Sequence, residues 1–306
     1  MRLIKPSFEI LEQEPGIQGI YKQIERAGRT CYKSEDHITE DSAEKFVNMF
    51  KDRQHTAMLE HGTVYLYIHK DHAYNVIGDN WVTEQYLSNS YSVINIDSYG
   101  NYHITTNYRV LYENDWLDDL KYLCEPTEYH EKRITVKFIC DRGVSHEFVR
   151  HRVFSFAQES TRYCNYSKDK FGNELTFIIP YWTNIPEGQS YWHDGIGYRV
   201  GADIQNKDFG YIEKSPNYFN FLSSLEESEK CYLRLLNEGW VPQQARSILP
   251  NSLKTELVMT GTVEQWKGFF KLRCDKAAHP QARELAIPLK EEFIKRNLIN
   301  NKYGDK

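Results

Sequence analysis

The sequence predicts an α+β fold, in which a mixed central sheet is flanked by helices. Stretches that alternate between apolar and polar residues, as half-buried strands do, occur at residues 61–68 and 133–140, and residues 255–260 are also predicted to be a strand. Amphipathic stretches with apolar residues at helical spacing occur near both ends of the chain, most clearly at residues 217–238. Because the two kinds of segment do not alternate strictly, we expect an α+β arrangement rather than a doubly wound parallel sheet.

The first sixty residues are expected to be mainly helical. Apolar residues recur at helical spacing from Ile17 to Ala27, and residues 42–50 (SAEKFVNMF) repeat the pattern. Residues 61–68 (HGTVYLYI) then alternate and are rich in β-forming side chains, which predicts a strand. Residues 70–132 are rich in Asn, Asp and Tyr and only weakly periodic. We interpret them as an insertion that carries short helices on the surface.

From residue 133 onward the predicted elements follow one another closely. The predicted strands are residues 133–140, 174–181 and 255–260. The predicted helices are residues 144–149, 217–238, 242–249, 263–274 and 280–297. Gly239 follows the longest helix at a position where glycine commonly ends one. Residues 182–216 are expected to be a loop or a second insertion, so that residues 1–306 form one domain with two insertions.

Composition limits the classes of function. The formal net charge of −5 argues against non-specific nucleic-acid binding, which depends on excess Lys and Arg. The first residues are too charged for a signal peptide, and no run approaches the roughly 20 apolar residues of a membrane span, so a cytoplasmic protein with no membrane contact is expected. The six cysteines lack a C-x-x-C pair, which argues against a zinc site and against a disulfide framework.

The densest group of residues that could bind a ligand or take part in catalysis lies within residues 150–162. Three arginines and a histidine in thirteen residues would repel one another unless an anion lay among them. Arginine forms bidentate, charge-assisted hydrogen bonds to phosphate, and hydroxyl and backbone N–H groups can complete a phosphate cradle. The group comprises Arg150, His151, Arg152, Ser160, Thr161 and Arg162.

A simpler interpretation remains open for the same segment. It could be a solvated basic turn whose arginines form ion pairs with Glu147 and Glu159. Arg246 and Arg273, taken alone, could be ordinary surface arginines. No G-x-G-x-x-G turn, no P-loop and no H-E-x-x-H pair is present, so a bound dinucleotide would be held by side chains and loops, and no metal is expected.

The segment RHRVFSFAQES, residues 150–160, resembles the Arg-His-Arg, seven residues, Ser signature of flavin-dependent thymidylate synthases. Four further segments resemble that family in the same order and at similar spacing: STRY at 160–163, HTAMLEH at 55–61, ARSILP at 245–250 and FFKLR at 269–273. The resemblance covers residues 20–68 and 133–297. It implies the family fold, with surface insertions at 70–132 and 182–216.

The resemblance implies two overlapping sets of site residues. The set that would hold FAD is His55, Ala57, Arg150, His151, Arg152, Gln158, Thr262 and Gly268. The set that would bind dUMP, chiefly at its phosphate, is Glu147, Arg150, Gln158, Glu159, Ser160, Thr161, Arg162, Arg246 and Arg273. Arg273 is implied as the catalytic residue, because a guanidinium beside the uracil ring would favour loss of the N3 proton.

The implied reaction is the reductive methylation of dUMP to dTMP. The one-carbon donor would be 5,10-methylenetetrahydrofolate, and FAD reduced by NADPH or NADH would supply the hydride. Members of this family are homotetramers with shared active sites, so a homotetramer is implied here. The implied partners are the nucleotide and the folate, with no nucleic acid.

The chain departs from the family pattern at several of these positions. Glu147 stands where many members have Gln, and Gln158 stands where many have Glu, so the acid and the amide are exchanged. Thr262 and Gly268 stand where Asn contacts the flavin, and Ala57 replaces a common Ser or Thr. The contacts to the cofactor are therefore less well determined than those to dUMP.

Three alternatives remain open from the sequence. A cysteine-dependent thymidylate synthase could use Cys164 or Cys274, because each lies close to an arginine that would lower its thiol pKa. A nucleotide- or RNA-binding module could use the arginines and tyrosines to clamp a strand. A degenerate homologue could bind flavin without synthase activity, for which the exchange at Glu147 and Gln158 is the motive.

Overall fold

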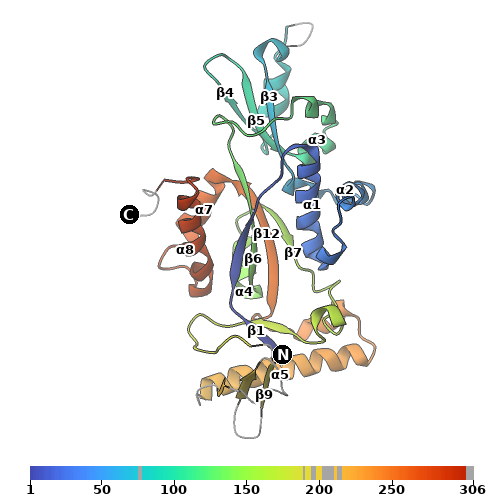
Figure 1. The fold of residues 1–306 in the computed structure, drawn as a ribbon, viewed down its shortest axis with the longest axis vertical. Coiled ribbons are helices and arrows are strands. Elements are labelled where there is room, and N and C mark those ends of the chain that lie inside the picture. Colours follow the sequence, from blue (N-terminus) through green and yellow to red (C-terminus); the bar gives the residue numbers. More distant parts are fainter. Residues whose placement is uncertain (75–77, 189, 194–197, 202–209, 212–215, 301–306) are drawn as a thin grey trace.

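The computed structural model describes residues 1–74, 78–188, 190–193, 198–201, 210–211 and 216–300. Its centre is a four-stranded sheet in the order β2-β6-β12-β7, with helices on both faces (Figure 1). These strands are β2 (Ser7–Leu11), β6 (Arg133–Asp141), β7 (Ser155–Gln158) and β12 (Lys254–Thr262). The α+β class predicted from the sequence is confirmed. The central sheet is antiparallel throughout, and the parallel pairing that makes the fold mixed lies in a separate pair of strands.

The two inner strands of this sheet carry most of its apolar side chains. β6 and β12 pair along their whole length, from Asp141 opposite Lys254 to Arg133 opposite Thr262. Alternate side chains point to opposite faces of a strand. Phe138 and Leu257 therefore pack against α4 (Arg142–Phe148), α7 (Val263–Arg273) and α8 (Pro280–Lys295) in one large core. Val258 packs on the other face against α1 (Gly16–Tyr32).

α1 covers the second face of the sheet, and α2 (Ser42–Asp52) packs against α1 (Figure 1). Their contact is close because Gly28 has no side chain. A Cβ at this position would lie 2.6 Å from the ring of Phe46 and 2.7 Å from that of Phe50. After α2 the chain passes through the short helix η2 (Thr56–His61) and enters β3 (Thr63–Ile68). The helices and the strand predicted for this region are confirmed.

The short helices expected for residues 70–132 are present, but the prediction missed two strands in this region, one of them buried. β4 (Val93–Ile96) and β5 (Tyr102–Asn107) pair with β3 in a second sheet of order β3-β5-β4, and every residue of β5 is buried. β5 alternates weakly because polar side chains such as Thr105 and Thr106 are buried along with Ile104. Short helical segments do occur around the strands, at η3 (Lys70–His72), η4 (Thr83–Leu87), α3 (Tyr108–Glu113) and η5 (Leu117–Tyr122).

A third region lies below the central sheet in Figure 1. β1 (Arg2–Ile4) pairs in parallel with β8 (Thr176–Ile178), which is the strand predicted at 174–181 but shorter. The region 182–216, expected to be a loop, contains the short strands β9 (Ser190–His193), β10 (Tyr198–Gly201) and β11 (Gly210–Tyr211), which form a sheet of their own. The rest of that prediction lies outside the described residues.

Long periodic segments in the C-terminal half were predicted well. α5 (Pro216–Asn237) is the longest helix, and Gly239 follows it with a φ of +98°, as expected for a glycine that ends a helix. α6 (Pro242–Ala245) and η7 (Arg246–Ile248) together occupy the predicted short helix. Strands β1, β2 and β7 were not predicted. Within the described part of the chain, no helix is long and apolar enough to cross a membrane.

Candidate active site

A pocket of about 530 Å³ lies beside β7, the free edge of the central sheet. Four residues predicted from the sequence line it: His55 and Ala57 at η2, and Gln158 and Ser160 at the end of β7. The two segments are about 100 positions apart in the chain and meet because η2 packs against β7. The folded chain therefore brings together two of the segments on which the resemblance was based.

Several lining residues were not predicted. Aromatic side chains supply part of the wall, and the rings of Tyr32 and Tyr163 lie 5.2 Å apart between centroids. Arg109 also lines the pocket, and its guanidinium forms ion pairs with Glu60 (2.5 Å) and Glu113 (2.8 Å). Arg109 lies in the region that we had interpreted as a surface insertion, and no local motif distinguishes it from other exposed arginines.

Two neighbouring residues of the motif face different environments. The Gln158 amide donates to the hydroxyl oxygens of Ser145 on α4 (2.9 Å) and Thr255 on β12 (3.2 Å), which fixes its orientation. The Glu159 carboxylate is buried, accepts a hydrogen bond from the Tyr166 hydroxyl (3.0 Å) and pairs with Lys254 (2.9 Å). Glu159 thus anchors the motif to the fold, while Gln158 lines the pocket.

Residues 160–162 lead away from the strand toward α6. The Ser160 N–H donates to the Cys31 carbonyl (3.0 Å), which ties the motif to the last turn of α1. Thr161 is buried, and its hydroxyl lies 3.4 Å from a terminal nitrogen of Arg246. The exposed Arg162 lies with its guanidinium carbon 5.4 Å from the centroid of its neighbour Tyr163. Two segments predicted to bind the same phosphate are therefore in contact.

Four of the predicted arginines carry uncompensated charge. Arg150 and Arg152 are exposed in the loop between α4 and β7, and Arg162 and Arg246 are also exposed. No ion pair involves any of the four within the part of the chain that the structure describes. The carboxylates of the simpler interpretation are paired with other residues, because Glu159 pairs with Lys254 and Glu147 pairs with Arg273. These four arginines therefore favour the binding of an anion, to which they could donate charge-assisted hydrogen bonds.

Arg273, at the end of α7, is held by three hydrogen bonds to α4 and the loop after it. It donates to the Glu147 carboxylate (2.6 Å), the Glu147 backbone carbonyl (2.6 Å) and Nε2 of His151 (3.0 Å). Burial, together with the nearby Arg273 charge, lowers the pKa of His151 to about 4. His151 is therefore neutral at pH 7 and accepts the hydrogen bond. A guanidinium has five N–H groups, so Arg273 retains two for another partner.

The last two predicted residues lie on α7, outside the pocket lining. The Thr262 hydroxyl accepts a hydrogen bond from the Gln265 N–H (3.2 Å) and caps the N-terminus of the helix. Gly268 is exposed, and a Cβ built there would meet no atom within 4 Å. The single chain thus brings predicted residues to the pocket, to the Arg273 contact with Glu147 and His151, and to the exposed arginine segments, whereas Thr262 and Gly268 belong to none of these groups. Among the described residues, no cluster of side chains is suited to a metal ion.

Comparison with known proteins finds relatives that are named flavin-dependent thymidylate synthase. The flavin-dependent thymidylate synthase of Pyrococcus furiosus is 29% identical over 160 residues, which are 52% of this chain and 53% of that protein. The one from Synechocystis sp. is 27% identical over 167 residues, 53% of this chain and 66% of that protein. The chain thus spans about half to two thirds of the length of these relatives.

Among solved structures, a UMP/dUMP methylase, PolB from Streptomyces cacaoi, bound with 5-Br dUMP, aligns over 96% of this chain and 93% of its own, with 16% identity and a TM-score of 0.41. The family model described as thymidylate synthase complementing protein matches residues 124–296. This match includes every arginine of the predicted site, from Arg150 to Arg273. Because it covers more than half of the chain, the protein belongs to the family of thymidylate synthase complementing proteins.

Proposed function

We propose that this protein is a flavin-dependent thymidylate synthase. The reaction converts dUMP, 5,10-methylenetetrahydrofolate and NADPH or NADH, with one proton, into dTMP, tetrahydrofolate and the oxidised nicotinamide, with FAD as the bound redox group. The observation that carries the proposal is the membership of the family, together with a motif that lines a pocket with Gln158 and Ser160 and carries exposed arginines without an ion pair to any described residue. Relatives with the name flavin-dependent thymidylate synthase support the same activity.

The residues present are chemically suited to FAD. The pocket volume lies within the usual range for small-molecule sites, and its wall includes the rings of Tyr32 and Tyr163, which suit a flat aromatic group. Arg150 and Arg152 are cations that suit a diphosphate. They do not line the pocket within one chain. This separation supports the further proposal that active sites are completed between copies in a homotetramer.

The dUMP phosphate is proposed to bind at Arg162 and Arg246, beside Ser160 and Thr161. Support comes from the 3.4 Å contact between Arg246 and Thr161 and from the lack of an ion pair at either arginine in the described structure. A phosphate there would accept charge-assisted hydrogen bonds from both guanidinium groups. Such bonds contribute about 1.5–3 kcal/mol each, so this pair would dominate recognition of the nucleotide.

Arg273 is proposed to stabilise negative charge on the uracil ring. Its orientation is set by Glu147 and His151 before any substrate arrives, and two N–H groups remain to donate to a ring carbonyl. A preoriented donor stabilises charge that develops during the reaction, and this charge makes C5 of the uracil nucleophilic. When bound, FAD supplies the hydride, and the protein contributes binding and electrostatics.

A cysteine nucleophile is not required by this proposal. Burial raises the pKa of the Cys164 thiol to about 12 and also raises that of Cys274. A thiol with a raised pKa carries little thiolate at neutral pH, and the thiolate is the reactive form. The environment of both residues therefore argues against the cysteine-dependent alternative.

The proposal is tested by incubating the purified protein with dUMP, 5,10-methylenetetrahydrofolate, NADPH and FAD and measuring dTMP, with one component omitted at a time. We expect dTMP only when all are present. Arg162→Ala should raise KM for dUMP by about 10- to 100-fold, because it removes a charged hydrogen bond. Arg234→Ala, an exposed arginine on α5, is the matched control and should leave KM unchanged.

The other outcomes separate the alternatives. Flavin that co-purifies with a protein that forms no dTMP would indicate a degenerate homologue. Absence of both flavin binding and dTMP would refute the proposal. Binding of single-stranded RNA that weakens steeply with salt would instead favour the RNA-binding module.

A further inference from the structure

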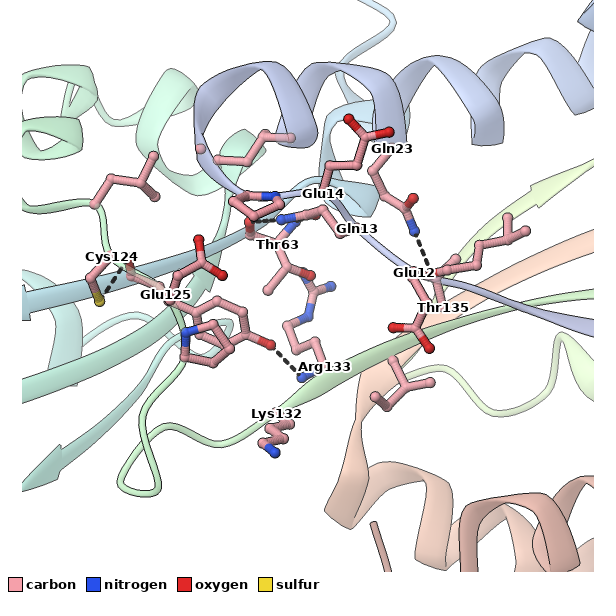
Figure 2. A pocket seen from close by; sticks show the side chains of 18 of the residues that line it. Glu12, Gln13, Glu14, Gln23, Thr63, Cys124, Glu125, Lys132, Arg133 and Thr135 are labelled. Carbon is pink, nitrogen blue, oxygen red and sulfur yellow. Dashed lines mark hydrogen bonds between the residues drawn. The ribbon is translucent and has the colours of Figure 1, made fainter. Parts of the chain in front are cut away.

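The second sheet has one covered edge and one open edge. Beside β3, the Cys124 N–H donates to the Tyr65 carbonyl (3.0 Å) and Leu123 forms an isolated bridge with Leu66, so the chain around Cys124 covers that edge. Figure 2 shows Cys124 and Glu125 on this covering segment. β4 forms the opposite edge and pairs with β5 alone among the described strands (Figure 1). The backbone groups along such an edge are available to pair with a further strand.

The segment that contains β4 exposes large apolar side chains close together. Single exposed apolar residues are common, whereas a group of them marks an interaction site. None of the roles proposed above uses this segment, and the family model matches only from residue 124 onward. Five such side chains lie within thirteen residues, with exposed fractions from 37% to 76%, and we call them the β4 edge: Leu87, Tyr91, Val93, Ile96 and Tyr99.

The β4 edge lacks the features that usually prevent edge strands from pairing. Natural edge strands are often protected by lysine, by proline or by a bulge. Residues 71–108 contain no Lys, Arg or Pro. The pairing of β4 with β5 runs in continuous register from Val93 opposite Thr105 to Ile96 opposite Tyr102, without a bulge. A further strand could therefore pair along this edge.

The charge around the β4 edge favours a basic partner. Residues 71–108 have a formal charge of −4, most of the net charge of −5 of the whole chain. Two exposed carboxylates flank the strand. Glu84 lies on η4, which packs against β4, and Glu128 precedes Tyr129, whose carbonyl accepts a hydrogen bond from the Asn95 amide (2.7 Å). Neither carboxylate forms an ion pair with a described residue, so both are available to a cation.

Two other kinds of occupant are less favourable. A second copy of the same edge would bring together two strands flanked by the same negative charge, which repulsion disfavours. An acidic partner would meet Lys70, which packs beside the Gly100 turn at the end of the hairpin, but it would face both carboxylates along the strand.

We propose that the β4 edge binds a basic, extended segment of another protein, which joins the second sheet as an additional strand. The backbone of this segment would pair with β4, as in other complexes that form by strand addition. Its apolar side chains would pack on Val93 and Ile96, and its cations would face Glu84 and Glu128. This surface goes beyond the proposed synthase activity, and its test does not depend on that activity.

The probe is a fluorescently labelled seven-residue peptide of alternating lysine and valine, titrated into the intact protein and followed by fluorescence anisotropy. A peptide of alternating glutamate and valine reverses the charge. A peptide of alternating lysine and proline keeps the charge but disfavours strand pairing. We expect saturable binding of the lysine–valine peptide with a Kd below about 1 mM, and at least about tenfold weaker binding of the other two. Amide hydrogen exchange at residues 93–96, measured by mass spectrometry, should slow when this peptide binds.

Ile96→Lys adds a cation to the β4 edge and removes an apolar contact, so it should weaken binding of the lysine–valine peptide about tenfold or more. Ile38→Lys makes the same substitution at an exposed isoleucine between α1 and α2. It is the matched control and should bind as the wild type does. Circular dichroism verifies folding, and Val93→Lys makes the same comparison should Ile96→Lys not fold.

Four results would overturn the proposal. They are a lysine–valine peptide that does not bind, equal binding of either matched peptide, normal binding by Ile96→Lys, and unchanged hydrogen exchange at residues 93–96. The proposal also fails if Ile96→Lys separates the native assembly into smaller species in analytical ultracentrifugation, because a second copy would then occupy the edge.

Discussion

Replacing Arg273 with glutamine should change the protonation of His151 and weaken the contact between α7 and α4. The wild-type guanidinium donates to His151 Nε2 (3.0 Å) and pairs with the Glu147 carboxylate (2.6 Å). Its positive charge disfavours a second charge on the imidazole. Glutamine removes that charge and is too short to make all three contacts.

The expected change in the pKa of His151 follows from the two causes that lower this pKa in the wild type. The pKa of His151 is lowered from 6.5 to about 4, first by burial and second by Arg273. Because burial is the larger cause, removing Arg273 restores less than half of the difference, and the pKa should rise to no more than about 5. The Arg273 and Glu147 side chains are 15% and 31% exposed. This ion pair is thus intermediate between an exposed and a buried one. Its loss should lower the free energy of unfolding by about 2 kcal/mol.

Stability should also depend on pH through His151. The unfolded chain binds a proton at this histidine near pH 6.5, whereas the folded protein binds it only near pH 4. The free energy of unfolding should therefore fall as the pH drops from about 6.5 to about 4, by about 1–2 kcal/mol once the partial exposure of His151 is considered. In Arg273→Gln this decrease should be smaller, because the two pKa values lie closer together.

The assay is an NMR titration of the His151 Cε1 proton, assigned with a His151→Gln variant, together with urea denaturation. Arg246→Gln is the control, because that exposed arginine has a single side-chain hydrogen bond to the described residues, the 3.4 Å contact with Thr161. Its stability should change by less than about 0.5 kcal/mol. An unchanged His151 pKa in Arg273→Gln, or equal stability losses in the two variants, would refute the reasoning.

Three further changes test the packing and the buried charges. Phe269 is fully buried among six aromatic rings, so Phe269→Ala should lower the free energy of unfolding in urea by about 3–5 kcal/mol, and a loss below about 1 kcal/mol would contradict this packing. Glu256→Gln removes the carboxylate shared by three partly buried lysines and should cost about 2 kcal/mol in thermal denaturation, whereas a rise in stability would show that the lysines do not need it. Burial raises the thiol pKa of Cys140 and Cys164, so both should react with iodoacetamide far more slowly in the folded protein than in urea, and rapid labelling of the folded protein, measured by peptide mass spectrometry, would argue against that burial.

Segments with a strong repeating pattern were predicted correctly, whereas short or polar strands were not. β6 and β12 have nine residues each and α5 has 22, and residues 133–138 of β6 alternate between polar and apolar, so these segments are long enough to be recognised from their own sequence. β7 has four residues and is a strand because it pairs with β12. β5 is buried despite its threonines because a second sheet and its helices enclose it. Such strands depend on their neighbours more than on their own sequence.

For the site, the sequence by itself determined the residue types and their order: the arginine motif, the segment around His55, and the two later arginines. Each of these segments is recognised from its own residues, so the folded structure is not needed to find it. Only the tertiary structure decided which charges pair. Glu147, just before the motif, and Glu159, within it, bind Arg273 and Lys254 from other elements, which leaves the motif arginines without an ion pair among the residues that the structure describes. Contacts of this kind join residues about 100 positions apart, and their partners are selected by the packing of helices against the sheet, which a linear pattern does not encode.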